Sequence, residues 1–391
     1  MDITAWSLVH AYGIQYAKVK DAAFSKGDLV KTTKEIKGEV LNGVSKYAYI
    51  LDWTEFSSYK ALYSLISSGV ITKTAFKPFT VNTGNAEKAF GYGSIVIPVA
   101  AQSIKPDSLY KLISKVSVDA GVKFYGVSTG FSTKGIDLGS ENVKVVREPK
   151  VALLTGQGVS STEAGEAWFT LNQYLGFPVT KLDIASLERA DLDQYNTLVV
   201  VSGNYNSLGK NLESKIKKWV SEGNLLITSE GASEWAIKQK LVDENLLDTT
   251  AIDKPSKVRI DFANSNESRP GRLSGSIFNV DLDITNPIGF GFKSRNIFVF
   301  RDGLTLLKPT KSQFGSVASY TNDPLVSGYV SKLNLSKIRN TSAIDYSNVG
   351  AGTVVLFSDN PNFRATWIGT SRLFLNSILF GNHLSKGGNN Y

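Results

Sequence analysis

Short apolar runs that alternate with helix-like segments constrain the fold of this chain most. Residues 211–223 repeat apolar side chains at helical spacing and separate two of these runs. The runs are near-continuously apolar, as central strands of a parallel sheet are, because both faces of such a sheet are covered. The clearest runs are KVALLTG (150–156), TLVVVSG (197–203) and LLITS (225–229). This alternation predicts an α/β fold with a doubly wound parallel sheet.

The first part of the chain predicts a smaller unit of the same class. Apolar strands are expected at 47–53, 94–100 and 123–129, with amphipathic helices between them. We therefore expect two flavodoxin-like or amidotransferase-like units, each with a doubly wound parallel sheet.

The expected boundaries follow shifts in composition. Residues 1–45 show low periodicity and are expected to form a lead-in or linker after a missing domain. Residues 46–146 are expected to form the first small α/β unit, and residues 147–391 a larger amidotransferase-like domain. From about 250 to 350 the sequence becomes rich in Ser, Asn and Gly with short strands, which predicts a β-rich insertion in the second unit.

Composition excludes several classes of function. The chain contains no cysteine, which excludes disulfides, thiolate metal sites and cysteine nucleophiles. No run of 18 apolar residues is present, so no membrane span is expected. The net charge is +8, but the lysines are scattered, and the dense runs at 31–37 and 215–219 include or follow an acidic residue. We expect solvated helix faces there and no nucleic-acid partner.

Residues 224–235, NLLITSEGASEW, predict a strand, a tight turn and the start of a helix. Many α/β hydrolases present a nucleophile on such an elbow. Here Glu230 stands where class I glutamine amidotransferases carry a cysteine, and Ser229 precedes it. The two histidines, His10 and His383, lie near the chain ends and begin no zinc-binding motif. We therefore predict no catalytic triad, no catalytic residue and no metal site.

Acidic pairs follow two of the predicted strands, at the edge where doubly wound sheets bind ligands. Glu163 and Glu166 lie near one helix start, and Glu230 and Glu234 near another, although the helix dipole also favours acids there. The candidate ligand-cleft residues are Ser161, Glu163, Ser229, Glu230, Asp359 and Arg364.

Two further features at this edge have alternative interpretations. The Arg364 guanidinium would suit a peptide carboxylate, and a salt bridge to an acidic neighbour is the alternative. The turn with Gly156 and Gly158 lacks the spacing of a dinucleotide or phosphate loop. We therefore interpret it as a turn that needs small residues.

Two segments, 149–183 and 350–381, resemble the C-terminal region of large bacterial zinc carboxypeptidases of the carboxypeptidase A superfamily. DNPNFR (359–364) and GT-x-x-LF-x-N (369–376) are the most specific motifs. Shorter matches, DITAWSL, YAYILDW, GSIVIPV and KGIDLGS, extend the resemblance over nearly the whole chain. In that family an amidotransferase-like domain follows a zinc peptidase domain. The resemblance implies a periplasmic or extracellular location, and zinc and peptide cleavage for a domain that this sequence lacks.

These features lead to two functional hypotheses. The first is a non-catalytic accessory region without a cofactor of its own, which packs against the N-terminal peptidase domain of the same polypeptide or assists its substrate binding. A peptide or a glycan is the expected further ligand. The alternative is an autonomous hydrolase that uses Glu230 with Ser229 or Ser161. Met1 is the only methionine and precedes a segment typical of the middle of a fold, so we expect an engineered start within a longer protein.

Overall fold

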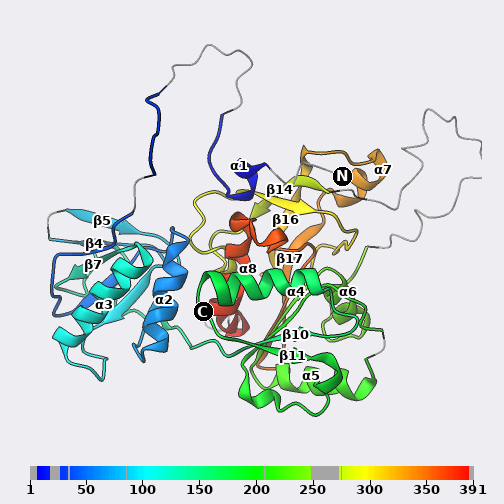
Figure 1. The fold of residues 1–391 in the computed structure, drawn as a ribbon, viewed down its shortest axis with the longest axis horizontal. Coiled ribbons are helices and arrows are strands. Elements are labelled where there is room, and N and C mark those ends of the chain that lie inside the picture. Colours follow the sequence, from blue (N-terminus) through cyan, green and yellow to red (C-terminus); the bar gives the residue numbers. More distant parts are fainter. Residues whose placement is uncertain are drawn as a thin grey trace, which may run out of the picture. The chain divides into compact units, whose positions relative to one another are not determined.

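The computed structural model describes residues 7–17, 27–33, 36–84, 86–206, 208–247, 273 and 275–386. The chain divides into two compact units; in Figure 1 the larger one is coloured green to red, apart from its helix α1 in dark blue. The smaller unit is Gly13–Val145, and the larger unit joins Met1–Tyr12 to Val146–Tyr391. Both units combine helices with sheets that contain parallel strands, so the predicted α/β class is confirmed.

The smaller unit contains a six-stranded sheet in the order β1-β7-β2-β6-β3-β9 and a three-stranded sheet in the order β5-β4-β8. Among the strands that the structure describes in this unit, only β1 and β7 pair in parallel. A fully parallel sheet was predicted here. Strands β6 and β7 do run in the same direction, as expected for strands joined by helix α3. Strand β2 lies between them and is antiparallel to both. The elements are β1 (Glu39–Leu41), β2 (Ala48–Leu51), α2 (Ser57–Ser67), β3 (Lys73–Ala75), β4 (Phe79–Asn82), β5 (Glu87–Phe90), β6 (Ile95–Pro98), α3 (Pro106–Ala120), β7 (Lys123–Val127), β8 (Lys134–Gly135) and β9 (Val143–Val145).

The larger unit is built on a nine-stranded sheet in the order β11-β10-β12-β13-β18-β17-β16-β14-β15. The first five strands in this order are parallel, and the other four extend the sheet with antiparallel pairs. The strands are β10 (Val151–Thr155), β11 (Val179–Asp183), β12 (Thr197–Val200), β13 (Leu225–Ser229), β14 (Ser276–Leu282), β15 (Asn296–Arg301), β16 (Ser316–Ser327), β17 (Ser342–Val349) and β18 (Gly352–Phe357).

Helices cover both faces of the parallel half. Alternate residues of β10, β12, β13 and β18 form one core cluster with buried side chains of α5 and α6. Helix α4 contacts β10, helix α8 contacts β13, and Gly381, directly after α8, lies against Leu225 at the start of β13. The helices are α1 (Leu8–Ala11), α4 (Ser161–Trp168), α5 (Lys210–Ser221), α6 (Gly231–Lys238), α7 (Lys332–Ile338) and α8 (Ile368–Phe380). Across the described residues, every helix is too short or too polar to traverse a lipid bilayer.

The predicted β-rich insertion extends the sheet. Residues 248–272 and 274 lie outside the described residues, so the described part of the insertion consists of residue 273 and the residues from 275 onward. Counting along the antiparallel pairs from β18 through β17, β16 and β14, strand β15 runs in the same direction as β18. The carboxyl end of β15 therefore belongs to the same edge of the sheet as the carboxyl ends of the parallel strands.

The segment that was expected as a linker contributes to both units. Helix α1 packs on the larger unit, where Ala11 joins a core cluster with Ile277, Phe300 and Trp367. Strand β1 instead forms an edge of the smaller unit's six-stranded sheet. Both are short elements, which explains why hydrophobic periodicity did not reveal them.

Candidate functional site

The predicted elbow is present at the carboxyl end of β13. Strand β13 ends at Ser229, Glu230 takes φ 48° and ψ −117°, and helix α6 begins at Gly231. A non-glycine residue at positive φ is strained, and such strain concentrates at functional sites. A Cβ at position 231 would lie 2.9 Å from the carbonyl oxygen of Gly203, so only glycine fits this close approach between two strand ends.

The Glu230 side chain lies in an acidic environment. Burial raises the pKa of Glu230 to about 9, and the carboxylates of Glu163, Asp302 and Asp359 add to the rise. The backbone at Gly303 approaches this carboxyl so closely that a Cβ there would stand 3.6 Å from it. Among the described residues, no side chain or backbone group donates a hydrogen bond to it. Glu230 is therefore a neutral carboxylic acid at pH 7, and a neutral acid can donate a hydrogen bond but is a poor nucleophile.

Glu163 brings a second carboxyl to the elbow. It lies in the first turn of α4, where its backbone N–H donates to the capping hydroxyl of Ser160. Its Oε2 accepts hydrogen bonds from the Ser202 N–H at 3.1 Å and from the Ser229 hydroxyl at 3.4 Å. Burial raises the pKa of Glu163 to about 7. The sequence alone revealed no base near Ser229, and the structure places Glu163 within hydrogen-bond reach of it.

Glu166 fixes the turn that contains Arg364. Its Oε1 accepts a hydrogen bond from the Arg364 backbone N–H at 2.7 Å, and its Oε2 accepts one from the Asn360 amide at 2.6 Å. Arg364 is itself in the left-handed region at φ 52°. Its guanidinium lies 5.3 Å from the centroid of the Phe363 ring. Burial raises the pKa of Glu166, and the Arg364 charge opposes that rise.

Asp359, the remaining predicted acid, forms a buried ion pair with Arg301. The Arg301 Nη1 lies 2.8 Å from the Asp359 Oδ1 and 2.8 Å from the Tyr320 hydroxyl, and Tyr320 also donates to Asp359. The Arg301 side chain is 0% exposed and stays protonated, because arginine keeps its charge in proteins. Burial raises the pKa of Asp359, and the guanidinium limits that rise. We describe this group as a charged pair.

Sequence reasoning missed Arg301 and Asp302. Arg301 is the last residue of β15 and Asp302 follows it in the run NIFVFRDG, and this basic and acidic pair at the end of an apolar run was the available signal. Burial raises the pKa of Asp302 as well. Because β15 runs in the direction of β18, both residues reach the edge that carries Asp359.

The structure therefore places most of the predicted residues along one edge of the sheet. Glu163, Ser229 and Glu230 meet at the elbow, while Asp359 and Arg364 lie along the same edge in separate hydrogen-bonded groups. Ser161 is the exception, because it lines a different cavity on the other side of α4.

Neither histidine adjoins the elbow. The His10 Nδ1 lies 2.6 Å from the Ser7 hydroxyl, and its ring contacts Phe298 edge to face. Gly381 lies at the start of β13, so the segment that carries His383 begins at the opposite end of that strand from Glu230. Within the described parts of the chain, no three His, Cys, Asp or Glu side chains are placed to hold a metal ion.

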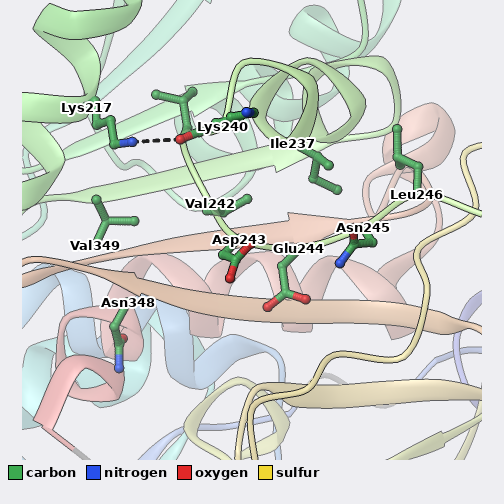
Figure 2. A pocket seen from close by; sticks show the side chains of 11 residues that line it. Lys217, Ile237, Lys240, Val242, Asp243, Glu244, Asn245, Leu246, Asn348 and Val349 are labelled. Carbon is green, nitrogen blue, oxygen red and sulfur yellow. Dashed lines mark hydrogen bonds between the residues drawn. The ribbon is translucent and has the colours of Figure 1, made fainter.

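Another cavity of the larger unit lies at the opposite edge of the nine-stranded sheet, where the parallel strands begin. It has a volume of about 560 Å³ and is bounded by the chain after α6 and by the end of β17 (Figure 2). Because β17 is antiparallel to β18, Asn348 and Val349 lie where the parallel strands begin. The Lys217 ammonium donates to the Lys240 carbonyl, and Glu244 accepts from the hydroxyls of Thr310 and Ser347. These polar groups are already paired, so we place the candidate site at the elbow.

No family model matches the sequence, and no curated protein matches it. Solved structures with a similar fold include PurLQS from Thermotoga maritima, at 14% identity and a TM-score of 0.41 over 60% of this chain and 99% of that one. A putative ThuA-like protein from Bacteroides uniformis matches at 11% identity and a TM-score of 0.38, over 62% and 94%. A putative GMP synthase subunit from Thermoplasma acidophilum matches at 10% identity and a TM-score of 0.36, over 59% and 96%. The structural neighbours thus include amidotransferase-like folds.

Proposed function

We propose that the larger unit is a ligand-binding accessory module that has the elbow of an amidotransferase-like fold without the chemistry of an amidotransferase. The observation that supports this most directly is Glu230. It occupies the strained elbow position, and its carboxyl is buried and neutral at pH 7. The sequence supplies no cysteine to replace it, and neither histidine adjoins it. Acyl transfer through a covalent intermediate needs an activated nucleophile at this position.

The chemistry of the edge indicates what such a module would bind. The neutral Glu230 carboxyl donates a hydrogen bond, and Glu163 donates or accepts according to pH. Hydroxyl-rich and amide-rich ligands offer both acceptors and donors, which favours a glycan or a peptide.

The resemblance to zinc carboxypeptidases supports a second part of the proposal. In this view the partner is the peptidase domain of the same polypeptide, zinc belongs to that domain, and the protein acts in the periplasm or outside the cell. We expect this chain to co-purify with the separately expressed peptidase domain at micromolar concentration. Absence of a complex at that concentration would count against the accessory role.

A specific observation favours one alternative, a hydrolase with its own acid and base. Glu163 and Glu230 share the elbow and have pKa values raised to about 7 and about 9, and Glu163 accepts a hydrogen bond from Ser229. Pairs of carboxyls whose pKa values differ are a common basis for acid–base catalysis. Against this, Ser229 is only 6% exposed, which limits its access to a substrate.

Turnover of labelled peptides and p-nitrophenyl esters separates the two functions. If the larger unit is an accessory module, the parent chain should show no more turnover than a double variant that carries Glu230→Gln and Glu163→Gln. Lys238→Gln, an exposed change on α6, is the matched control for surface effects. Turnover that both Glu230→Gln and Glu163→Gln abolish, and that Lys238→Gln leaves intact, would establish the hydrolase instead.

A further inference from the structure

Helix α4 has a second functional face. Glu163 and Glu166 point toward the elbow edge, where they bind Ser202 and Asn360. A different set of residues lines a cavity, and its spacing of three, four and seven positions places it on one side of a helix. These residues are Ser161, Ala164, Gly165 and Trp168.

The cavity on that side has a volume of about 220 Å³. Its remaining walls come from the end of β10 and the following turn, with Thr155, Gly156 and Val159, and from Lys181 on the edge strand β11. This position is at the carboxyl ends of β10 and β11, on the edge where ligands bind to doubly wound sheets.

A glycine in α4, exposed to solvent, lines this space. A Cβ at position 165 would have no heavy atom within 4 Å, so nothing in the described structure fills the volume beside it. Glycine inside a helix destabilises it by about 1 kcal/mol relative to alanine. The helix thus has a destabilising residue where a side chain would project into the cavity.

Two side chains give the cavity its chemistry. The Lys181 ammonium lies over the Trp168 ring, 5.0 Å from its centroid, so the cavity wall combines a cation with an aromatic ring. Among the described residues, no Asp or Glu lies within ion-pair distance of Lys181. An anion that carries an apolar body would match both groups.

Asp183 limits the charge of that anion. It follows Lys181 by two positions on β11, and a Cβ at Gly156 would stand 2.8 Å from its carboxylate. Asp183 accepts a hydrogen bond from the Ala185 N–H and so remains beside the turn. A nearby negative charge disfavours a dianion such as phosphate more than a single carboxylate.

We propose that this cavity binds a small molecule with one carboxylate on a flat apolar body. The carboxylate pairs with Lys181, and the body lies against Trp168 in the space beside Gly165. This site is separate from the elbow edge, and the proposal does not depend on the function assigned there.

Titration with benzoate tests the proposal directly. Trp168 is partly exposed, and the other tryptophans among the described residues are between 0% and 4% exposed, so fluorescence quenching should report this site. Ligand-observed NMR with the same probe gives a second readout. We expect saturable binding by benzoate, weaker binding by the neutral benzyl alcohol and little competition by inorganic phosphate.

Two variants should remove binding for different reasons. Gly165→Leu should abolish it by filling the cavity, and its melting temperature should not fall, because leucine is the better helix former. Lys181→Gln should weaken benzoate binding about tenfold, and should leave benzyl alcohol binding unchanged.

Matched controls exist in the smaller unit. Gly91→Leu also adds a side chain where nothing lies within 4 Å, and Lys144→Gln removes an ammonium that lies 4.7 Å from the Phe76 ring centroid. Both should bind benzoate like the parent chain. No saturable binding by the parent chain, full binding by Gly165→Leu or Lys181→Gln, or equal binding of benzyl alcohol or phosphate would overturn the proposal.

Discussion

The carboxyl edge of the larger unit contains two groups of buried acids that differ in their counter-charge. Asp359 faces the Arg301 guanidinium at 2.8 Å and accepts a further hydrogen bond from Tyr320. Glu163 and Glu230 form no ion pair among the described residues, and burial raises both pKa values. Burial alone therefore does not decide the role of an acid. An acid with its cation stabilises the fold, whereas acids without one remain available for a ligand or a proton.

At pH 6, removal of the cation should have the largest effect. Arg301→Met leaves Asp359 buried without its partner, and loss of one member of a buried pair lowers the free energy of unfolding by about 3–5 kcal/mol. Urea unfolding of the larger unit measures this. The double variant Arg301→Met with Asp359→Leu should lose less than Arg301→Met alone, because it leaves no unpaired charge. An equal or greater loss in the double variant would show that the guanidinium acts through packing.

The next largest effect is expected at Glu230, which forms no ion pair among the described residues, and this effect depends on pH. The folded-state pKa of Glu230 is about 9, above the value of 4.5 for an unperturbed glutamate, so the native state retains a proton that the unfolded chain loses. The contribution of Glu230 to stability is therefore complete below pH 4.5 and is lost as the pH rises to 9. The slope is about 1.4 kcal/mol per pH unit, which amounts to about 2 kcal/mol at pH 6.

Glu230→Gln should remove this slope and increase stability progressively from pH 5 to pH 9. Urea unfolding at several pH values measures the difference from the parent chain. Glu222→Gln, on the exposed end of α5, serves as the control. A parallel pH dependence in Glu230→Gln and the parent chain would mean that Glu230 is ionised in the folded state.

A smaller effect is expected on the pKa of Glu230 when Glu163 is replaced. The Glu163 charge is the largest contribution to the raised pKa of Glu230 after burial. Glu163→Gln should therefore lower the pKa of Glu230 toward the ordinary glutamate range, as a carboxyl NMR titration would show. Asp281→Asn, which removes an exposed carboxylate paired with Arg295, should leave that pKa unchanged. An unchanged Glu230 pKa in Glu163→Gln would break the assignment of the two acids to one site.

The smallest effect is expected for an exposed ion pair on the same helix as Gly231. Lys238 lies 2.9 Å from Glu234, and its side chain is 60% exposed. Lys238→Ala should change the free energy of unfolding by about 0.5 kcal/mol or less, because water screens such pairs. A loss as large as that of Arg301→Met would contradict the distinction between buried and exposed pairs.

The parallel half of the larger unit was predictable because its signals are local. The apolar runs at 150–156, 197–203 and 225–229 contain the observed strands β10, β12 and β13, and helix α5 falls within one residue of the expected start. The elbow was also predictable, since Ser229, Glu230 and Gly231 are consecutive. Each of these features depends on side chains close together in the sequence.

The smaller unit was less predictable. Its strands at 48–51, 95–98 and 123–127 coincide with apolar runs, but their pairing is largely antiparallel. The position of β2 between β6 and β7 depends on packing across the whole sheet. An apolar run indicates that a strand is buried, but it does not indicate which strands lie beside it.

The sequence by itself determined the α/β class of this protein, the buried strands and the lack of cysteine, because composition and periodicity are properties of the chain alone. Only the tertiary structure decided that Arg301 pairs with Asp359, that Glu163 reaches Ser229, and that Ser161 belongs to a separate cavity. The first two pairs lie 58 and 66 positions apart in the chain. Contacts of that separation depend on strand order and helix orientation, and those are set by burial of the whole core.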